Sequence, residues 1–238
     1  MRPPVLSQIT KYVDHLEDYL ASDESPERDL PIVMSHLYPV CTHPIILYNT
    51  EQRTRTAVLA AFVARAHQPD VAEVWDYSQA NLAILAEHGI VGRHVPVGTT
   101  VGRAQEMRED ISGQRQTYDI GFSGAISQRR AAVLLSLQEA GLRVRNVPIF
   151  GRARDRALAQ SLCMLNIHFA DDYRVFESVR CDPWLSVGVP IVSETSLDDD
   201  PRCINVPYSE LVSATVQLVQ RLKEEREAMT AGVAAAST

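Results

Sequence analysis

Residues 163–194 read CMLNIHFADDYRVFESVRCDPWLSVGVPIVSE, and this stretch decides the fold. The apolar run Met164–Ile167 ends in His168, and a second apolar run, Val189–Val192, leads to Glu194. The residues between the two runs are typical of a helix. Two strands that are apolar on both faces and joined by a helix indicate a parallel β-sheet. Ligands of such open sheets bind beyond the carboxyl ends of the strands, which is where His168 and Glu194 lie.

The composition is that of a soluble globular protein. The chain has 238 residues, of which 45% are hydrophobic and 22% charged, and its formal net charge is −7. This charge does not favour binding to nucleic acid or to an anionic membrane. No apolar run approaches the roughly 20 residues of a membrane span, and the first residues lack the pattern of a secretory signal. The four cysteines form no CxxC pair, so we expect neither zinc nor disulfides, and we expect a cytoplasmic protein.

Strand-like and helix-like segments alternate along both halves of the chain, which is typical of βαβ units. The first half is expected to contain a helix over 5–20, a polar loop over 21–29, strands at 32–35, 45–48, 73–75 and 94–97, and helices over 51–66 and 79–88. The second half is expected to contain strands at 119–123, 144–149, 164–167, 189–192 and 204–206, and helices over 127–140, 152–161 and 208–227 before a frayed tail.

These segments predict an α/β protein with two Rossmann-like lobes, whose parallel sheets face a cleft. The expected domains are an N-terminal lobe over residues 1–102 and a C-terminal lobe over residues 118–238. The polar segment 103–117 has no strong apolar period, so we interpret it as a linker between the lobes.

The stretch GFSGAISQRR (121–130) combines a strand end, a glycine turn and a helix start. Gly121 and Gly124 would let the backbone approach a ligand, and the helix beginning near Ser127 would offer free N–H groups to an anion. Arg129 and Arg130 lie in its first turn, where they oppose the helix dipole, so a bound phosphate would be a suitable counterion. Two solvated arginines are the alternative. The GxxG spacing differs from the GxGxxG fingerprint, which argues against a standard NAD enzyme.

Further ligand contacts are expected at other strand ends and helix starts. Gly151 follows a strand and opens a helix, although a tight turn would also explain it. A carboxylate at Glu177 is favoured by the helix dipole and would accept hydrogen bonds from two sugar or ribose hydroxyls. Arg180 lies three residues further on the same helical face, so an intrahelical ion pair is the alternative.

Two carboxylates of the first half are candidates for a general base. Glu51 follows the strand that ends at Tyr48, and Asp76 follows the strand that ends at Trp75. A base at either position would deprotonate an acceptor hydroxyl. Helix capping is the alternative for both, with Thr50 as the N-cap of the first helix. His36 and His43 have no metal-site spacing.

In their order along the chain, five segments resemble a compact GT-B glycosyltransferase of the small bacterial and large-virus type. They are ILYNTEQ (46–52), VWDYSQANLAIL (74–85), HVPVG (94–98), GFSGAISQRR (121–130), and LNIHF with FESVR and GVPIVSE (165–194). The resemblance covers roughly residues 31–215 and implies that the first lobe binds the acceptor and the second the nucleotide-sugar.

The resemblance also implies roles for particular residues. On the donor side it places Ser123, Gly124, Arg129, Arg130 and Gly151 near the diphosphate, and His168, Arg174, Phe176, Glu177 and Arg180 around the sugar, ribose and phosphate. Glu51 and Asp76 would face the acceptor, and Glu177 is also a candidate catalytic residue. No bound metal is expected, because helix dipoles and arginines neutralise the leaving diphosphate. Many retaining members have two glutamates eight residues apart, but here Leu185 stands eight residues after Glu177.

The sequence therefore predicts transfer of a sugar from a nucleoside diphosphate sugar to a hydroxyl of a glycan or related acceptor. The donor is a substrate, and no other cofactor is expected. The alternatives are a non-catalytic nucleotide-sugar-binding module and another nucleotide-dependent Rossmann enzyme. The donor base and sugar, the acceptor, the stereochemistry and the oligomeric state do not follow from the sequence.

Overall fold

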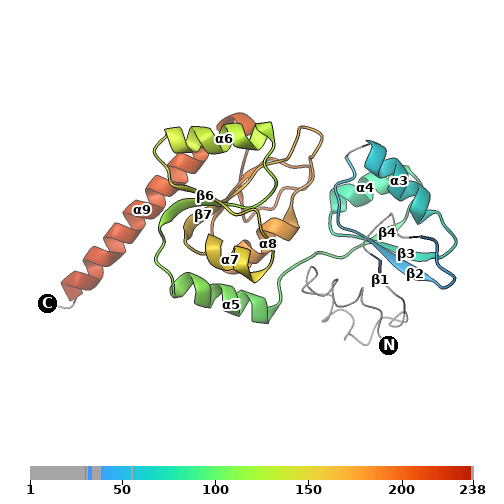
Figure 1. The fold of residues 1–238 in the computed structure, drawn as a ribbon, viewed down its shortest axis with the longest axis horizontal. Helices are drawn as coiled ribbons and strands as arrows, with labels where there is room; N and C mark the ends of the chain where they lie inside the picture. The colour runs from blue at the N-terminus through green and yellow to red at the C-terminus, as the bar shows by residue number, and fades with distance from the viewer. Residues whose placement is uncertain (1–29, 31, 34–38, 55, 237–238) are drawn as a thin grey trace. The chain divides into compact units, whose positions relative to one another are not determined.

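The structure is a computed structural model that describes residues 30, 32–33, 39–54 and 56–236. The helix predicted over 5–20, the polar loop over 21–29, residues 34–35 of the first predicted strand and His36 lie outside the described residues. The chain forms two α/β units, and each contains a wholly parallel sheet (Figure 1). The predicted α/β class with parallel sheets is confirmed.

Unit 1 consists of residues 1–101 together with two later segments, 171–183 and 196–200. Its sheet has the order β1-β2-β3-β4. The strands are β1 (Ile32–Val33), β2 (Ile45–Asn49), β3 (Val71–Asp76) and β4 (Gly92–His94), and the helices are α3 (Thr56–Ala66) and α4 (Gln79–Glu87).

Both faces of strand β2 are buried, which explains its continuous apolar sequence. Ile45 and Leu47 belong to a core cluster with Phe62 of α3 and Leu85 of α4. The alternate residues Ile46 and Tyr48 belong to a second cluster with Trp75 of β3. Val175, which comes from the later segment 171–183, is fully buried in this second cluster, so unit 1 is completed by residues from far along the chain.

Unit 2 consists of residues 102–170, 184–195 and 201–238. Its sheet has the order β6-β5-β7-β8-β9. The strands are β5 (Tyr118–Phe122), β6 (Val144–Asn146), β7 (Ser161–Asn166), β8 (Ile191–Glu194) and β9 (Ile204–Val206). The helices are α5 (Val101–Ser112), α6 (Gln128–Glu139), α7 (Arg152–Leu158), the 3-10 turn η1 (Tyr208–Glu210) and α9 (Leu211–Ala236). A further helix, α8 (Ser178–Ser186), begins in unit 1 and ends in unit 2.

Helices cover both faces of the unit 2 sheet. Helices α6 and α9 lie on one side of it, and α5 and α7 lie on the other (Figure 1). Leu137 of α6 and Leu218 of α9 pack with Ile120 and Leu165 of the central strands in one core cluster. On the other side, a Cβ atom added to Gly121 would lie 2.6 Å from Met164 Sδ and 3.1 Å from Leu158 Cδ2. Packing inside the sheet therefore explains Gly121, and its expected role in ligand approach stays a prediction.

Several predicted boundaries differ from the structure. The helix expected over 51–66 begins only at Thr56, so Thr50 is not its N-cap. The strand expected at 94–97 is β4, which ends at His94. The segment expected to be a linker, 103–117, holds helix α5 within unit 2. Helix α9 continues through most of the tail that was expected to be frayed. Within the described residues, no helix combines the length and apolar character needed to cross a membrane.

Candidate functional site

The sheet of unit 2 has a topological switch point between β5 and β7. From β5 the chain passes to β6 on one side and then to β7 on the other side. Crossover connections of opposite direction leave a crevice at the carboxyl ends of the two strands, where open α/β sheets bind ligands. The loops that follow these ends are residues 123–127 and 167–170, so the structure places Ser123, Gly124 and His168 at the switch point.

Arg129 and His168 meet at a single carboxylate, Glu194, at the end of β8. The Arg129 guanidinium donates to both carboxylate oxygens. The backbone N–H of His168 donates to Glu194 Oε2 at 3.0 Å, and His168 Nδ1 lies 3.9 Å from Oε1. The guanidinium carbon also lies 3.7 Å from the centre of the Tyr208 ring. Arg129 thus already has a protein counterion, which the sequence argument for a phosphate counterion did not include.

Arg130 is buried and ties the first loop of the switch point to the second. Its Nε donates to the carbonyl of Ile167 at 2.9 Å, and its Nη1 donates to the carbonyl of Ala125 at 3.0 Å. Ser127 caps α6 by accepting a hydrogen bond from the Arg130 backbone N–H at 3.2 Å. The side chain therefore fixes the loop shape, and a direct phosphate contact by Arg130 stays a prediction.

Two glycines of the predicted donor site have backbone conformations that favour glycine. Gly124 has a φ of 148°, within the loop that follows β5. Gly151 has a φ of 71° and precedes the short helix α7, and a Cβ atom there would meet nothing within 4 Å. Backbone geometry alone thus explains Gly151, and its ligand contact stays a prediction.

Asp76 of unit 1 lies in a closed polar network at the carboxyl ends of β2 and β3. Its side chain is fully buried, and its oxygens accept hydrogen bonds from Asn49 Nδ2 at 2.5 Å, the Ser78 backbone N–H at 2.8 Å and Asn81 Nδ2 at 3.1 Å. Burial raises the pKa of Asp76 to about 7, outweighing these hydrogen bonds, which lower it. The carboxylate is enclosed by the protein, so a role as general base would require this network to open.

Glu51 joins the same network through its backbone while its side chain is exposed. Its carbonyl accepts from Asn49 Nδ2 at 2.8 Å and from Asn81 Nδ2 at 3.0 Å, and its N–H donates to Asn49 Oδ1 at 3.0 Å. Arg53 is buried beneath the loop and also donates to Asn49 Oδ1. The loop after β2 is therefore held rigidly, with the Glu51 carboxylate presented to solvent.

The remaining predicted donor residues lie in unit 1, on the segment 171–183. Glu177 pairs with Arg180 at 2.5 Å, and the two side chains are 21% and 17% exposed. The ion pair that was the alternative for these residues is therefore present, although Glu177 lies one residue before α8. Phe176 is buried and Arg174 is exposed. The resemblance assigned all four to the nucleotide-sugar lobe, whereas the structure groups them with Glu51 and Asp76.

The sequence analysis missed two acceptor side chains that shape the unit 1 edge, Gln52 and Asp198. Gln52 accepts a hydrogen bond from the Val175 N–H, and Asp198 accepts from the Phe176 N–H and from the Ser78 hydroxyl. Gln52 lies 123 residues before Val175, and Asp198 lies 120 residues after Ser78. No local pattern could have indicated contacts at such separations.

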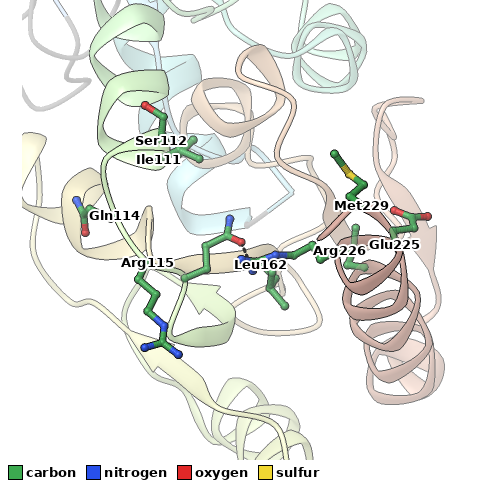
Figure 2. Close-up of a pocket in the computed structure, with 10 residues that line it drawn as sticks. Ile111, Ser112, Gln114, Arg115, Leu162, Glu225, Arg226 and Met229 are labelled. Carbon is green, nitrogen blue, oxygen red and sulfur yellow. Dashed lines mark hydrogen bonds between the residues drawn. The ribbon is translucent and has the colours of Figure 1, made fainter. Parts of the chain in front are cut away.

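Two further observations concern binding sites elsewhere. Within the residues that the structure describes, no group of three or more His, Cys, Asp or Glu side chains is placed to hold a metal ion. A pocket of about 480 Å³ lies beside the amino ends of β5 and β7, between the end of α5 and helix α9 (Figure 2). Arg226 Nη1 donates to Gln116 Oε1 at 2.6 Å across it. The pocket contains none of the predicted site residues.

The chain is similar to several uncharacterized proteins of Acanthamoeba polyphaga mimivirus. It is 30% identical to protein L140 over 164 residues, which are 64% of this chain and 52% of the relative. It is 26% identical to protein L137 over 88% of this chain and 31% of the relative, and 26% identical to protein L138 over 87% and 24%. The chain thus spans about a quarter to a half of these relatives. No protein-family model and no solved structure matches it.

Proposed function

We propose that the protein is a glycosyltransferase that moves a sugar from a nucleoside diphosphate sugar to a hydroxyl of a glycan or related acceptor. In this proposal unit 2 is the donor-side lobe and unit 1 the acceptor-side lobe of a GT-B fold, and the reaction takes place in the cytoplasm without a bound metal. The proposal is supported by the order of the GT-B-like segments in the sequence and by the parallel α/β architecture of each unit.

The observation that carries the proposal is the switch point of unit 2. There a glycine turn at Gly124, the capped start of α6 and the Arg129–Glu194–His168 cluster occupy neighbouring strand ends. The N-terminus of α6 favours an anion, and a guanidinium is the side chain best suited to phosphate oxygens. Because Glu194 holds the Arg129 guanidinium in the free protein, an incoming diphosphate has to share or replace that carboxylate.

The chemical scheme requires few groups. Charge that develops on the departing diphosphate would be stabilised by the α6 N-terminus and Arg129. If the configuration inverts, a carboxylate accepts the proton of the acceptor hydroxyl. Of the two candidates, Glu51 is exposed and Asp76 is enclosed, so we assign this role to Glu51.

A panel of ligands tests the proposal directly. A nucleoside diphosphate at 100 times its Kd is expected to stabilise the protein by about 2.7 kcal/mol, measured as a rise in melting temperature. A rise with NAD alone would instead indicate another nucleotide-dependent Rossmann enzyme. Binding of a nucleotide-sugar without either transfer or slow hydrolysis would indicate a non-catalytic binding module.

Arg129→Ala is expected to weaken binding of the nucleoside diphosphate by about tenfold or more while changing nucleoside binding little, because a charge-assisted contact to phosphate is lost. The substitution also removes the guanidinium from the buried Glu194 carboxylate, so Arg129→Ala/Glu194→Gln should be measured beside it. Arg152→Ala is the matched control, because Arg152 is an exposed arginine of the same unit. Equal losses for the nucleoside and its diphosphate would reject the phosphate role of Arg129.

A further inference from the structure

The backbone just before Glu177 is fixed by two side chains from distant parts of unit 1. The N–H of Val175 donates to Gln52 Oε1 at 2.9 Å. The N–H of Phe176 donates to Asp198 Oδ1 at 2.8 Å. Val175 and Phe176 are both buried, so these two consecutive amides depend on protein acceptors.

Both acceptors are themselves held in place. Asp198 Oδ2 accepts a hydrogen bond from the Ser78 hydroxyl at 2.5 Å, and the same hydroxyl oxygen caps α4 by accepting from the Asn81 N–H at 3.2 Å. Gln52 is 6% exposed, and its Nε2 lies 3.5 Å from Glu177 Oε1. The amides are thus connected to the rigid loops that follow β2 and β3.

The Glu177 side chain has a different environment from the two residues before it. Its carboxylate is partly exposed, while Val175 and Phe176 anchor the backbone in the core of unit 1. Arg180 contacts one carboxylate oxygen, and Gln52 approaches the other. Such an arrangement limits the directions that the carboxylate can take, which is the requirement for a group that must meet a ligand in one orientation.

We propose that Gln52 and Asp198 are positioning residues that set the orientation of Glu177 toward the donor sugar. This inference rests on the proposed function and on the donor contact that the resemblance implies for Glu177. Neither side chain needs to touch the ligand. Asp198 acts through the Phe176 amide, and Gln52 acts through the Val175 amide and the Glu177 carboxylate.

The test compares Asp198→Ala with Asp198→Asn in the full-length protein. Asp198→Ala removes the acceptor, so amide hydrogen exchange at Phe176 and the donor KM are both expected to rise by about fivefold or more. Asp198→Asn keeps an oxygen that accepts from Phe176 and an amide that can donate to the Ser78 hydroxyl oxygen, so both values are expected to return close to wild type. Asp199→Ala is the matched control, because the Asp199 carboxylate lies in the same short segment and accepts from the Ser196 N–H, not from the Phe176 amide.

A second pair of variants tests Gln52. Gln52→Glu places a second carboxylate beside Glu177 and should raise the amide hydrogen exchange of the 171–183 segment. Gln52→Glu/Glu177→Gln restores a hydrogen-bond donor and an acceptor between positions 52 and 177. The double variant is expected to recover slow exchange but not transfer, since the Glu177 carboxylate is missing. Recovery of transfer would overturn the role of that carboxylate, and with it the proposal.

The outcomes separate this inference from the proposed function. If the wild-type protein neither transfers nor hydrolyses any nucleotide-sugar, the proposed function fails, whatever the exchange data show. If the wild type transfers sugar and Asp198→Ala speeds exchange without changing the donor KM, Asp198 is purely structural and the positioning role fails. If Asp198→Asn is as impaired as Asp198→Ala, the charge itself is required, which also contradicts the proposal.

Discussion

Asp76 ends strand β3 of unit 1 and Glu194 ends strand β8 of unit 2, and the protein itself supplies the hydrogen-bond donors to both carboxylates. Asp76 accepts from two asparagines and a backbone amide, and Glu194 accepts from Arg129 and the His168 amide. A sequence pattern that places an ionisable residue at a strand end therefore identifies the right edge of the sheet. Whether the group is available to a ligand depends on the side chains around it, which the pattern does not contain.

Asp76 should make the stability of the protein fall as the pH rises toward neutrality. Its folded-state pKa of about 7 exceeds the unfolded value of about 3.9, so the folded state binds more protons between these values. The free energy of unfolding then decreases by up to about 1.4 kcal/mol for each pH unit in the middle of this window. Chemical denaturation at pH 5 and pH 7.5 measures the effect.

Asp76→Asn is the variant that isolates this contribution. Asparagine does not ionise, so the difference in stability between pH 5 and pH 7.5 should shrink in the variant relative to wild type. An unchanged difference would show that Asp76 is ionised in the folded protein throughout the window. The variant should also be less stable at pH 5, because an asparagine keeps one acceptor oxygen, and its NH₂ group cannot accept the hydrogen bonds that the other carboxylate oxygen accepts.

At the scale of elements, the helices with local start and stop signals were predicted well. The helices expected over 79–88 and 127–140 are α4 and α6, and Gly89 and Gly141 follow their ends with positive φ. Ser127 is the N-cap of α6, while the N-cap of α4 is Ser78 and not Asp76, for which capping was the alternative. These signals lie within a few residues of the boundary they mark, so a sequence contains them in full.

Elements that depend on distant partners were predicted poorly. Helix α5 is mostly polar and buries only Ala104 and Met107. Its polar side chains pair with α7 through a largely buried ion pair, Arg103–Asp155, and an exposed one, Arg152–Glu106. An apolar period cannot reveal such a helix. The late start of α3 has a similar cause, since the loop before it is held by Asn81 and by contacts with the segment 171–183.

Helix α9 is attached to the sheet by an ion cluster around the buried carboxylate of Asp119, and this cluster should be lost in acid. Asp119 of β5 lies 2.8 Å from Lys223 Nζ and 3.2 Å from Arg143 Nη2. Burial raises the pKa of Asp119, but the hydrogen bonds from Arg143 and Lys223 outweigh it and lower the pKa to about 2. The stabilisation is therefore complete above the unfolded pKa of about 3.9 and is lost as the pH falls toward 2.

Asp119→Asn should remove this acid-dependent part of the stability. The variant is expected to be destabilised at pH 6 by about 1–3 kcal/mol, because charged partners lose a buried acceptor. The difference in the free energy of unfolding between variant and wild type should narrow as the pH is lowered from 4 to 2. Urea denaturation at a series of pH values measures this difference. Glu225→Gln is the control, because its ion pair with Arg221 on the same helix is exposed. A constant gap across this range would contradict the assignment.

At the scale of the whole molecule, the two units do not correspond to two halves of the sequence. The chain leaves unit 2 after Ala170 and after Thr195, and each time it contributes a segment to unit 1 before returning. These segments supply a core residue, Val175, and an anchoring carboxylate, Asp198. The domain division at residues 102 and 118 followed from the alternation of strands and helices. That alternation records the order of elements and cannot show which sheet a later loop completes.

This exchange of segments predicts that a substitution in the second half of the sequence will destabilise the unit formed by the first half. In a Trp184→Phe background, Trp75 is the remaining tryptophan and reports on the core of unit 1. Val175→Ala should lower the denaturation midpoint seen by Trp75 fluorescence, with a loss of about 1–3 kcal/mol in the free energy of unfolding for a fully buried valine.

Val192→Ala is the matched control, because Val192 is equally buried but belongs to the core of unit 2. If the units unfold separately, Val192→Ala should not change the denaturation midpoint reported by Trp75. Equal shifts from both variants would show a single transition for the molecule, and an unchanged midpoint in Val175→Ala would contradict the place of Val175 in unit 1.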